Sequence, residues 1–203
     1  MLKLYYSPGA CSLASHIALA ESGQPFEAIK VDGRAKTAAN GENYWDVTPK
    51  GYVPALRLDD GTVLTEGTAI LPYIADRNPA AALAPVAGTL ARYRLHEWLG
   101  YINSEVHKGF GPFFTPGATD AAKQAGRESL TKRLNYAQTE LGSKSYLLGE
   151  QFTVADGYLF TVLRWLKAAT LDLSQWPGLK AYHDRIAARP AVIAAMTAEG
   201  LIK

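Results

Sequence analysis

The sequence of 203 residues contains only one cysteine, Cys11. A lone cysteine cannot form an intramolecular disulfide, which suits a reducing compartment and leaves one thiol for chemistry or for a mixed disulfide with a small thiol. No apolar run approaches the roughly 18 residues that a membrane-spanning helix needs. The first residues do not resemble a signal peptide, because Lys3 and Pro8-Gly9 interrupt their apolar stretch. We therefore expect a cytoplasmic protein with no membrane partner.

A large excess of either charge is also missing. The chain has 21 basic and 19 acidic residues, a net charge of +2, and no basic run interleaved with aromatic residues. Nucleic acid is therefore not an expected partner. With 48% hydrophobic and 20% charged residues, the composition is that of an ordinary globular protein. Its length allows one large domain or two small ones.

The stretch around Cys11 predicts the end of a strand, a tight turn and the start of a helix. Alternating residues before Tyr6 suit a half-buried strand, and Pro8-Gly9 ends it. Apolar residues then recur at helical spacing, and Gly23 can end that helix. A cysteine in a first helical turn is stabilised as a thiolate by the helix dipole. Equally, a lone cysteine is often a small buried hydrophobic residue, and both interpretations stay open.

The next residues predict the rest of a small α/β domain. Residues 26–31 alternate like a second strand, and residues 32–50 resemble a loop with a short helix. Asp59-Asp60-Gly61 predicts a hairpin, and residues 65–78 predict a helix that ends at Asn78-Pro79. The order β-α-β, loop, β-β-α is typical of a thioredoxin-like domain with a mixed four-stranded sheet. We assign residues 1–79 to this domain.

The remainder of the chain predicts helices alone. Residues 80–88, rich in alanine, proline and glycine, form the expected linker, and residues 89–203 the expected all-α domain. Amphipathic patterns cover residues 89–109 and 120–141. Thr153-Val154-Ala155-Asp156 is a capping-box pattern before an apolar helix, and Arg189-Pro190 breaks the last helical region.

A second set of candidate residues lies on the predicted helix 89–109. Asn103, Ser104 and His107 share one helical face, and Lys108 follows. One interpretation is a solvated face with a surface histidine, followed by core aromatic residues. In the other, this face closes a cleft over Cys11, with His107 and Lys108 giving positive or donor character to the sulfur. The phenylalanines beyond it would then line an apolar pocket; they are Phe110, Phe113 and Phe114.

The dipeptide Val53-Pro54 also allows two interpretations. A proline at the entrance of a strand lacks a ladder donor, so it often marks an edge or a strand start. In a thioredoxin-like domain it would instead lie beside the helix that carries the cysteine, often after a cis bond. The main chain of Val53 would then pair with an extended peptide.

Five stretches resemble sequences of bacterial beta-class glutathione S-transferases, and the likeness runs along the whole chain. In that class a cysteine stands where many other classes have a catalytic tyrosine or serine, and Cys11 occupies this place. The stretches are YYSPGACSL (5–13), VPAL (53–56), LTEG (64–67), EVHKG (105–109) and TVAD (153–156).

The resemblance implies a cytosolic homodimer that uses glutathione as co-substrate and holds no permanent cofactor or metal. It implies that Cys11 meets the glutathione sulfur, that Lys36 reaches the glycyl carboxylate and that Val53 pairs with the cysteinyl backbone. Glu66 and the Gly67 N–H would hold the γ-glutamyl end, His107 would approach Cys11, and Ser104 would come from the neighbouring subunit. The implied pocket for a hydrophobic electrophile is formed by Tyr6, Phe110, Phe113, Phe114 and Trp165.

Two positions depart from the family pattern. Gly67 replaces a frequent serine, which keeps the backbone donor, and Gly100 replaces an asparagine that often contacts the glutamyl group. The predicted activity is conjugation of glutathione to hydrophobic electrophiles, with Cys11-dependent thiol–disulfide exchange. The alternatives are a low-turnover binding protein for hydrophobic ligands or glutathione, and a glutathione-dependent reductive dehalogenase or peroxidase.

Overall fold

The computed structural model describes residues 1–202, which fall into two compact units. The first unit is Met1–Ala84 together with the segment from Ala188 onward, and the second is Pro85–Ala187. The sequence prediction had instead placed everything after residue 88 in one helical domain. Within the described residues, no helix is both long and apolar enough to cross a membrane.

The first unit is built on a mixed sheet with the strand order β3-β2-β1-β4-β5. β1 and β2 are parallel, and the other neighbouring pairs are antiparallel. The strands are β1 (Leu2–Tyr6), β2 (Phe26–Asp32), β3 (Thr37–Ala38), β4 (Ala55–Arg57) and β5 (Val63–Thr65). The predicted hairpin around Gly61 is confirmed as the β4–β5 pair.

The prediction of four strands was wrong by one, because β3 adds a fifth. The chain folds back directly after β2, where the Asp32 carboxylate accepts hydrogen bonds from the N–H groups of Arg34 and Ala35 at 2.8 and 2.9 Å. Such an Asx-type turn returns the chain alongside β2. β3 has only two residues, too few for an alternating pattern to show in the sequence.

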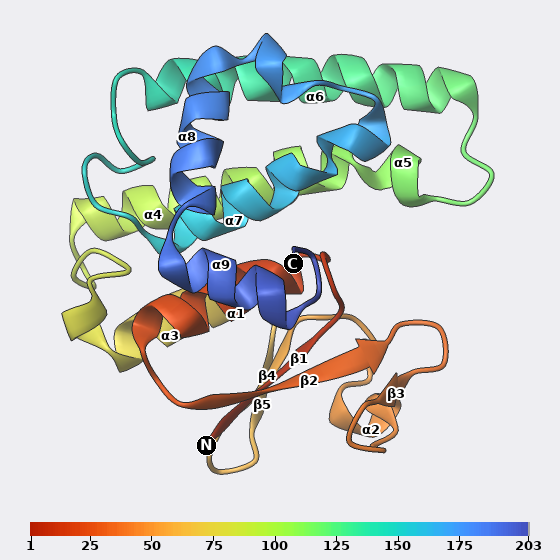
Figure 1. The fold of residues 1–203 in the computed structure, drawn as a ribbon, viewed down its shortest axis with the longest axis vertical. Coiled ribbons are helices and arrows are strands. Elements are labelled where there is room, and N and C mark those ends of the chain that lie inside the picture. The colour runs from red at the N-terminus through yellow and green to blue at the C-terminus, as the bar shows by residue number, and fades with distance from the viewer. Residues whose placement is uncertain (203) are drawn as a thin grey trace. The chain divides into compact units, whose positions relative to one another are not determined.

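Helices cover the sheet of the first unit. They are α1 (Ser12–Ser22), α2 (Tyr44–Val47), α3 (Gly67–Arg77), the 3-10 turn η1 (Pro79–Ala81) and α9 (Pro190–Ala198). α1, α3 and α9 lie side by side on one face of the sheet (Figure 1). On this face the Tyr6 ring lies 5.4 Å from the His16 ring of α1. On the other face Tyr5 packs against Tyr44 of α2, with ring centroids 5.7 Å apart. This alternation follows from the period of two along a strand.

The last helix, α9, packs on α1 and so belongs to the first unit. At its start, the Arg189 guanidinium donates to both carboxylate oxygens of Glu21 at 2.6 and 2.8 Å. These partners are separated by 168 residues, so the sequence contained no local signal for this packing.

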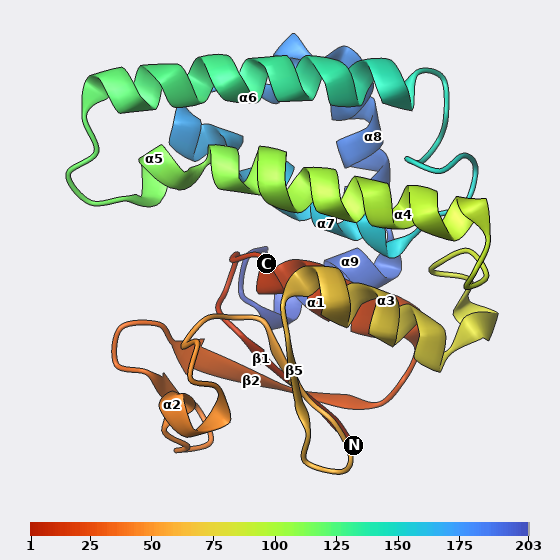
Figure 2. The same ribbon diagram turned by 180° about the vertical axis from the view of Figure 1, so that it is seen from behind.

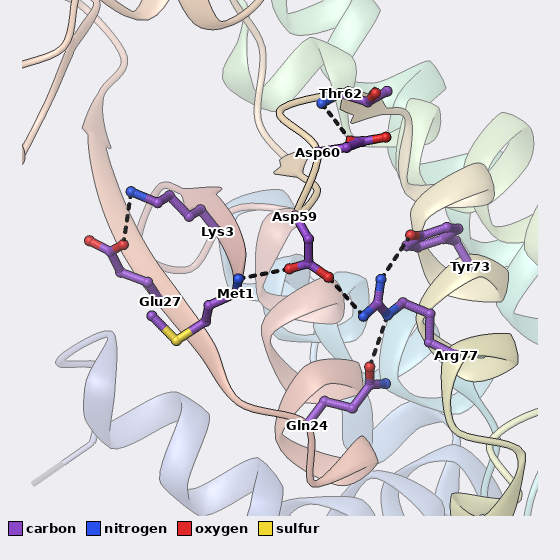
Figure 3. Close-up of polar contacts among 9 residues, drawn as sticks. All are labelled: Met1, Lys3, Gln24, Glu27, Asp59, Asp60, Thr62, Tyr73 and Arg77. Atoms are coloured by element: carbon purple, nitrogen blue, oxygen red, sulfur yellow. Dashed lines mark hydrogen bonds and ion pairs between the residues drawn. The ribbon is translucent and has the colours of Figure 1, made fainter.

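A polar network closes the end of the sheet where β1 begins (Figure 3). The terminal ammonium of Met1 lies 2.8 Å from the Asp59 carboxylate, and the same carboxylate accepts from Arg77 at 3.0 Å. Arg77 also donates to Gln24 at 3.2 Å and to the Tyr73 hydroxyl at 3.3 Å. Since Cys11 follows the other end of β1, this network holds the sheet at the end away from the thiol.

The second unit is helical, as predicted. Its elements are α4 (Leu90–Tyr101), η2 (Ile102–His107), α5 (Gly111–Phe114), α6 (Asp120–Leu141), α7 (Val154–Leu163), η3 (Arg164–Ala169), η4 (Leu173–Gln175) and α8 (Pro177–Ala187). Figure 2 shows α4 and the long α6 from the side opposite to Figure 1. The helix expected over residues 89–109 stops being α-helical at Tyr101, and Ile102–His107 forms a π-helical turn.

All ten residues of α7 are buried, which confirms its predicted central place in the helical part. The predicted capping box is present as well. The Asp156 carboxylate accepts from the Thr153 N–H at 2.7 Å, from the Leu147 N–H at 2.8 Å and from the Tyr182 hydroxyl at 2.9 Å. A buried carboxylate with this many donors fixes the start of α7.

Candidate functional site

Cys11 stands directly before the first residue of α1. It occupies the N-cap position with helical dihedral angles, φ −58° and ψ −22°. We had predicted the first helical turn, so the thiol lies one residue earlier. Its sulfur is 3.4 Å from the carbonyl oxygen of Val53, within reach for a weak thiol hydrogen bond. The thiol therefore lies between the positive end of the α1 dipole and a carbonyl acceptor.

Ser12 fixes the turn that leads to Cys11. The Ser7 N–H donates to the Ser12 hydroxyl oxygen at 3.1 Å, and this hydroxyl donates to the Ser7 carbonyl at 3.2 Å. The Ala10 N–H also donates to the Ser7 carbonyl, at 3.0 Å. Ser12 is buried. The sequence prediction missed this role, although a serine next to a turn is the usual residue for such bonds.

Val53 and Pro54 lie just before β4 and are joined by a cis peptide bond. The segment is held from α2, because the Tyr44 hydroxyl donates to the Tyr52 carbonyl at 2.8 Å. Burial raises the pKa of Tyr44, and the nearby charge of an ionised Cys11 raises it further. Tyr44 therefore stays a neutral donor near the sulfur, a role with no signal in the sequence.

Lys36 is tied to main-chain and aromatic groups of the same unit. Its ammonium donates to the Gly51 carbonyl at 2.8 Å and lies 5.4 Å from the centroid of the Trp45 ring. Gly51 has φ +63°, and a Cβ there would come within 2.5 Å of the Trp45 ring. Lys36 itself has φ +54°, an uncommon conformation for a residue with a side chain. The backbone at Lys36 and at Gly51 therefore determines where the Lys36 ammonium lies.

Glu66 and Gly67 lie at the start of α3. Glu66 has φ +69°, and its carboxylate accepts from the Lys50 ammonium at 2.6 Å. Both side chains are exposed, 62% for Glu66 and 48% for Lys50. The first N–H groups of a helix have no partner within it, so those of α3 suit a ligand carboxylate. A non-glycine residue at positive φ before such a site is a frequent mark of function.

Tyr6, a predicted co-substrate residue, is only 8% exposed and packs on His16 of α1. Its ring therefore serves the core of the first unit. Burial raises the pKa of its hydroxyl, and the charge of Glu199 adds to this shift.

In the second unit, the π-helical turn presents His107 to Tyr158 of α7. The His107 Nδ1 atom lies 2.8 Å from the Tyr158 hydroxyl, which donates its own proton to Asn103 Oδ1 at 3.0 Å. A hydroxyl has one proton, so Nδ1 must be the donor towards Tyr158 and Nε2 keeps its lone pair. π-Helical turns are frequent at functional sites, and the sequence did not predict this one.

Burial, with a smaller effect of the Lys108 charge, lowers the pKa of His107 from 6.5 to about 4. His107 is therefore neutral at pH 7 and carries no positive charge there, while donor character of His107 towards the sulfur stays a prediction. Its chemistry is that of a neutral acceptor. The charge of this turn is on Lys108, which is exposed. Ser104 is exposed too, and its hydroxyl donates to the Gly100 carbonyl at 3.0 Å.

Three of the predicted aromatic residues form one cluster. The Trp165 ring lies 4.9 Å from His107 and 5.6 Å from both Phe110 and Phe114. Phe110 is fully buried, whereas Phe114 is 55% exposed and Trp165 is partly exposed, so Phe114 and Trp165 are the members that a ligand can reach. Phe113 turns towards α6, where it fills the space over Gly126.

Residues 9–77 match the family described as "Glutathione S-transferase, N-terminal domain", and residues 101–190 match "Glutathione S-transferase, C-terminal domain". The chain is 48% identical over 200 residues to glutathione S-transferase GstA of Escherichia coli O157:H7, covering 98% of this chain and 100% of that relative. The chain belongs to the glutathione S-transferase family. Members of this family use glutathione as co-substrate.

Solved structures of bacterial glutathione S-transferases have the same fold. A beta-class enzyme of Sphingomonas chungbukensis is 51% identical with a TM-score of 0.95, over 98% of this chain and 100% of the other. A sphingomonad enzyme in complex with glutathione is 50% identical with a TM-score of 0.95, at the same coverage. The beta-class resemblance and the predicted transferase fold are confirmed.

The predicted site residues of this glutathione S-transferase thus fall into two groups. In the first unit the structure brings together Cys11 and Val53-Pro54, while Lys36 contacts the Gly51 carbonyl and Glu66 contacts Lys50, both shortly before Val53 in the sequence. In the second unit it brings together His107, Phe110, Phe114 and Trp165. Among residues 1–202, no group of three or more histidine, cysteine or acidic side chains is arranged to hold a metal ion.

Proposed function

We propose that this transferase joins the sulfur of glutathione to small hydrophobic electrophiles, and that Cys11 adds thiol–disulfide exchange. In conjugation, the glutathione thiolate attacks the electrophilic carbon, a carbon–sulfur bond forms, and a leaving group such as chloride departs with the electron pair. In exchange, the Cys11 thiolate attacks the glutathione sulfur of a mixed disulfide, and the other thiolate leaves. A second glutathione then releases Cys11 and forms glutathione disulfide.

The observation that carries the exchange step is the place of Cys11 at the start of α1, 3.4 Å from the Val53 carbonyl. A helix start favours the thiolate. A carbonyl oxygen has two lone pairs, so Val53 can accept from the thiol and from the cysteinyl N–H of glutathione together. Such a pairing lays the ligand sulfur beside Cys11.

For the remaining contacts we propose the residues that the resemblance implies. Lys36 binds the glycyl carboxylate, while Glu66 and the Gly67 N–H bind the γ-glutamyl end. His107 approaches Cys11, Ser104 comes from the neighbouring subunit, and Lys108 contributes positive charge. We propose Phe114 and Trp165 as the main contacts of the electrophile, because Tyr6, Phe110 and Phe113 are occupied in packing.

The test compares wild type with Cys11→Ala and Cys11→Ser in two assays: conjugation of 1-chloro-2,4-dinitrobenzene and reduction of hydroxyethyl disulfide. We expect exchange to fall by at least about 1,000-fold in both variants, because the attacking thiolate is gone. Conjugation should fall by less than about tenfold, because its nucleophile is glutathione. Undiminished exchange in Cys11→Ala would remove Cys11 from the reaction. Absence of both activities in wild type despite tight glutathione binding would favour a binding protein.

We also propose a cytoplasmic homodimer. The supporting feature is α4, where Leu90 and Tyr93 are 72% and 63% exposed, because exposed apolar side chains on one helix suit contact with another subunit. One chain has a mass of 21.9 kDa, and light scattering at micromolar concentration should give twice that mass. A monomeric mass would contradict the proposal.

A further inference from the structure

A buried carboxylate, that of Glu199, comes from the opposite end of the sequence from Cys11. Glu199 follows α9, and its side chain is completely buried. One carboxylate oxygen accepts from the Gly9 N–H at 2.9 Å, and the other lies 2.9 Å from His16 Nδ1. Gly9 precedes Cys11 by two residues, and His16 belongs to α1. A single side chain therefore holds both the turn before the thiol and the helix after it.

Two further contacts join the C-terminal segment to α1 and to the turn before it. Gly9 has φ +70°, and the Leu201 side chain lies over it, 3.3 Å from the position of a Cβ. At the other end of α9, Arg189 binds Glu21 at the far end of α1. Glu199 and Arg189 thus join the two ends of α9 to α1, and the Glu199 contact also reaches the turn before Cys11.

Burial fixes the position of the Glu199 carboxylate. A buried carboxylate is costly unless hydrogen bonds compensate it, so its place is sharply defined once they do. The hydrogen bond from the Gly9 N–H is part-buried, and loss of its acceptor leaves a donor that the turn would rearrange to satisfy. Displacement at Gly9 would move Cys11 relative to the first N–H groups of α1 and to the Val53 carbonyl.

We propose that Glu199 is a positioning residue for the Cys11 thiol, acting through the Gly9 N–H, so that the C-terminal segment sets the reactivity of the cysteine at the start of the chain. The proposal rests on the role of Cys11 in exchange. Glu199, which the sequence prediction placed in the helical domain, is thereby added to the residues that act on Cys11.

The experiment uses Glu199→Ala and Glu199→Gln, with Glu21→Gln as the matched control at the other anchor. Two readouts are measured on folded protein: the pH profile of Cys11 alkylation by iodoacetamide, and kcat and KM for exchange. In Glu199→Ala we expect the alkylation midpoint to move up by about one pH unit towards an ordinary thiol. We expect kcat/KM for exchange to fall about tenfold.

Glu199→Gln should restore the wild-type behaviour within about twofold, because the amide has nearly the same volume and its oxygen can still accept from the Gly9 N–H. Glu21→Gln should also stay within about twofold, because it loosens α9 without touching Gly9. If Glu199→Ala does not fold, Leu201→Ala replaces it, with a midpoint shift in the same direction of a few tenths of a unit.

Two results would overturn the inference. One is a folded Glu199→Ala with the wild-type midpoint and turnover. The other is an equal change in Glu21→Gln, which would assign the effect to the packing of α9 in general. Failure of the proposed function is a separate result, seen as exchange that persists in Cys11→Ala, since alkylation reports on the thiol without any turnover.

Discussion

The turn at Cys11 and the turn at His107 hold their side chains in different ways. At Cys11 each contact joins a main-chain group to a side chain: the Val53 carbonyl receives the thiol, and the Ser7 and Gly9 N–H groups donate to the side chains of Ser12 and Glu199. At His107, the contacts are between side chains, from the imidazole through Tyr158 to Asn103. A main-chain acceptor such as the Val53 carbonyl is kept in nearly every variant. A series of hydrogen bonds between side chains is broken by a substitution at any one of them.

The difference extends to charge. The Cys11 turn has features that favour an anion, since it opens a helix. The His107 turn is buried enough to keep its imidazole neutral at pH 7. From this comparison we expect single substitutions to act more strongly on stability in the second unit, and more selectively on chemistry in the first.

The largest effect is expected at Asp156, which anchors the helix that carries Tyr158. Asp156→Ala leaves the Leu147 N–H, the Thr153 N–H and the Tyr182 hydroxyl without their acceptor. We expect a loss of about 3 kcal/mol in the free energy of unfolding, measured in urea. The control is Asp184→Ala, which removes an exposed pair with Lys180 and should cost less than about 0.5 kcal/mol. Equal losses in the two variants would contradict the comparison.

The next effect is a change in the pH dependence of stability at His107. Because the folded pKa is about 4 and the ordinary value is 6.5, the unfolded chain binds a proton in this window that the folded chain does not. Stability is therefore fully present above pH 6.5 and falls as the pH drops to 4. His107→Asn, which keeps a donor towards Tyr158, should lose about 2 kcal/mol less than wild type between pH 7 and 4. His96→Asn, at an exposed position, is the control, and parallel curves for His107→Asn and wild type would refute the shift.

In the first unit, Gly51→Ala should combine backbone strain with a clash. Its Cβ would meet Trp45 at 2.5 Å, at φ +63°. The matched control, Gly23→Ala, has φ +66° and no atom within 4 Å of its Cβ. We expect both variants to lose about 1 kcal/mol to strain, and Gly51→Ala about 1 kcal/mol more. Displacement of Trp45 should also raise the KM for glutathione through Lys36, and an unchanged KM would argue against Lys36 as a ligand.

The smallest effect is expected at Lys50. Its pair with Glu66 is exposed on both sides, so Lys50→Ala should change the free energy of unfolding by less than about 0.5 kcal/mol. Glu66→Ala should have as little effect on stability and should still raise the KM for glutathione, because Glu66 is the proposed ligand. Equal KM values in the two variants would contradict this division of roles.

Features encoded by neighbouring residues could be read from the sequence. The Pro8-Gly9 turn, the end of α1 at Gly23, the hairpin around Gly61 and the capping box at Asp156 each depend on local propensity or on a bond between residues three apart. The chain as a whole also carried enough motifs to indicate the beta-class resemblance. Fold class and the position of Cys11 at a helix start were therefore predictable.

Tertiary structure alone decided the contacts between distant residues. Glu199 lies 190 residues from Gly9, and Tyr158 lies 51 residues from His107. The neutral state of His107 depends on burial, which no local pattern expresses. By itself the sequence determined where a thiol follows a turn. The packing of α9 decided which groups hold that turn, and the packing of α7 decided that His107 stays uncharged. Burial and long-range hydrogen bonds exist only once the chain has folded.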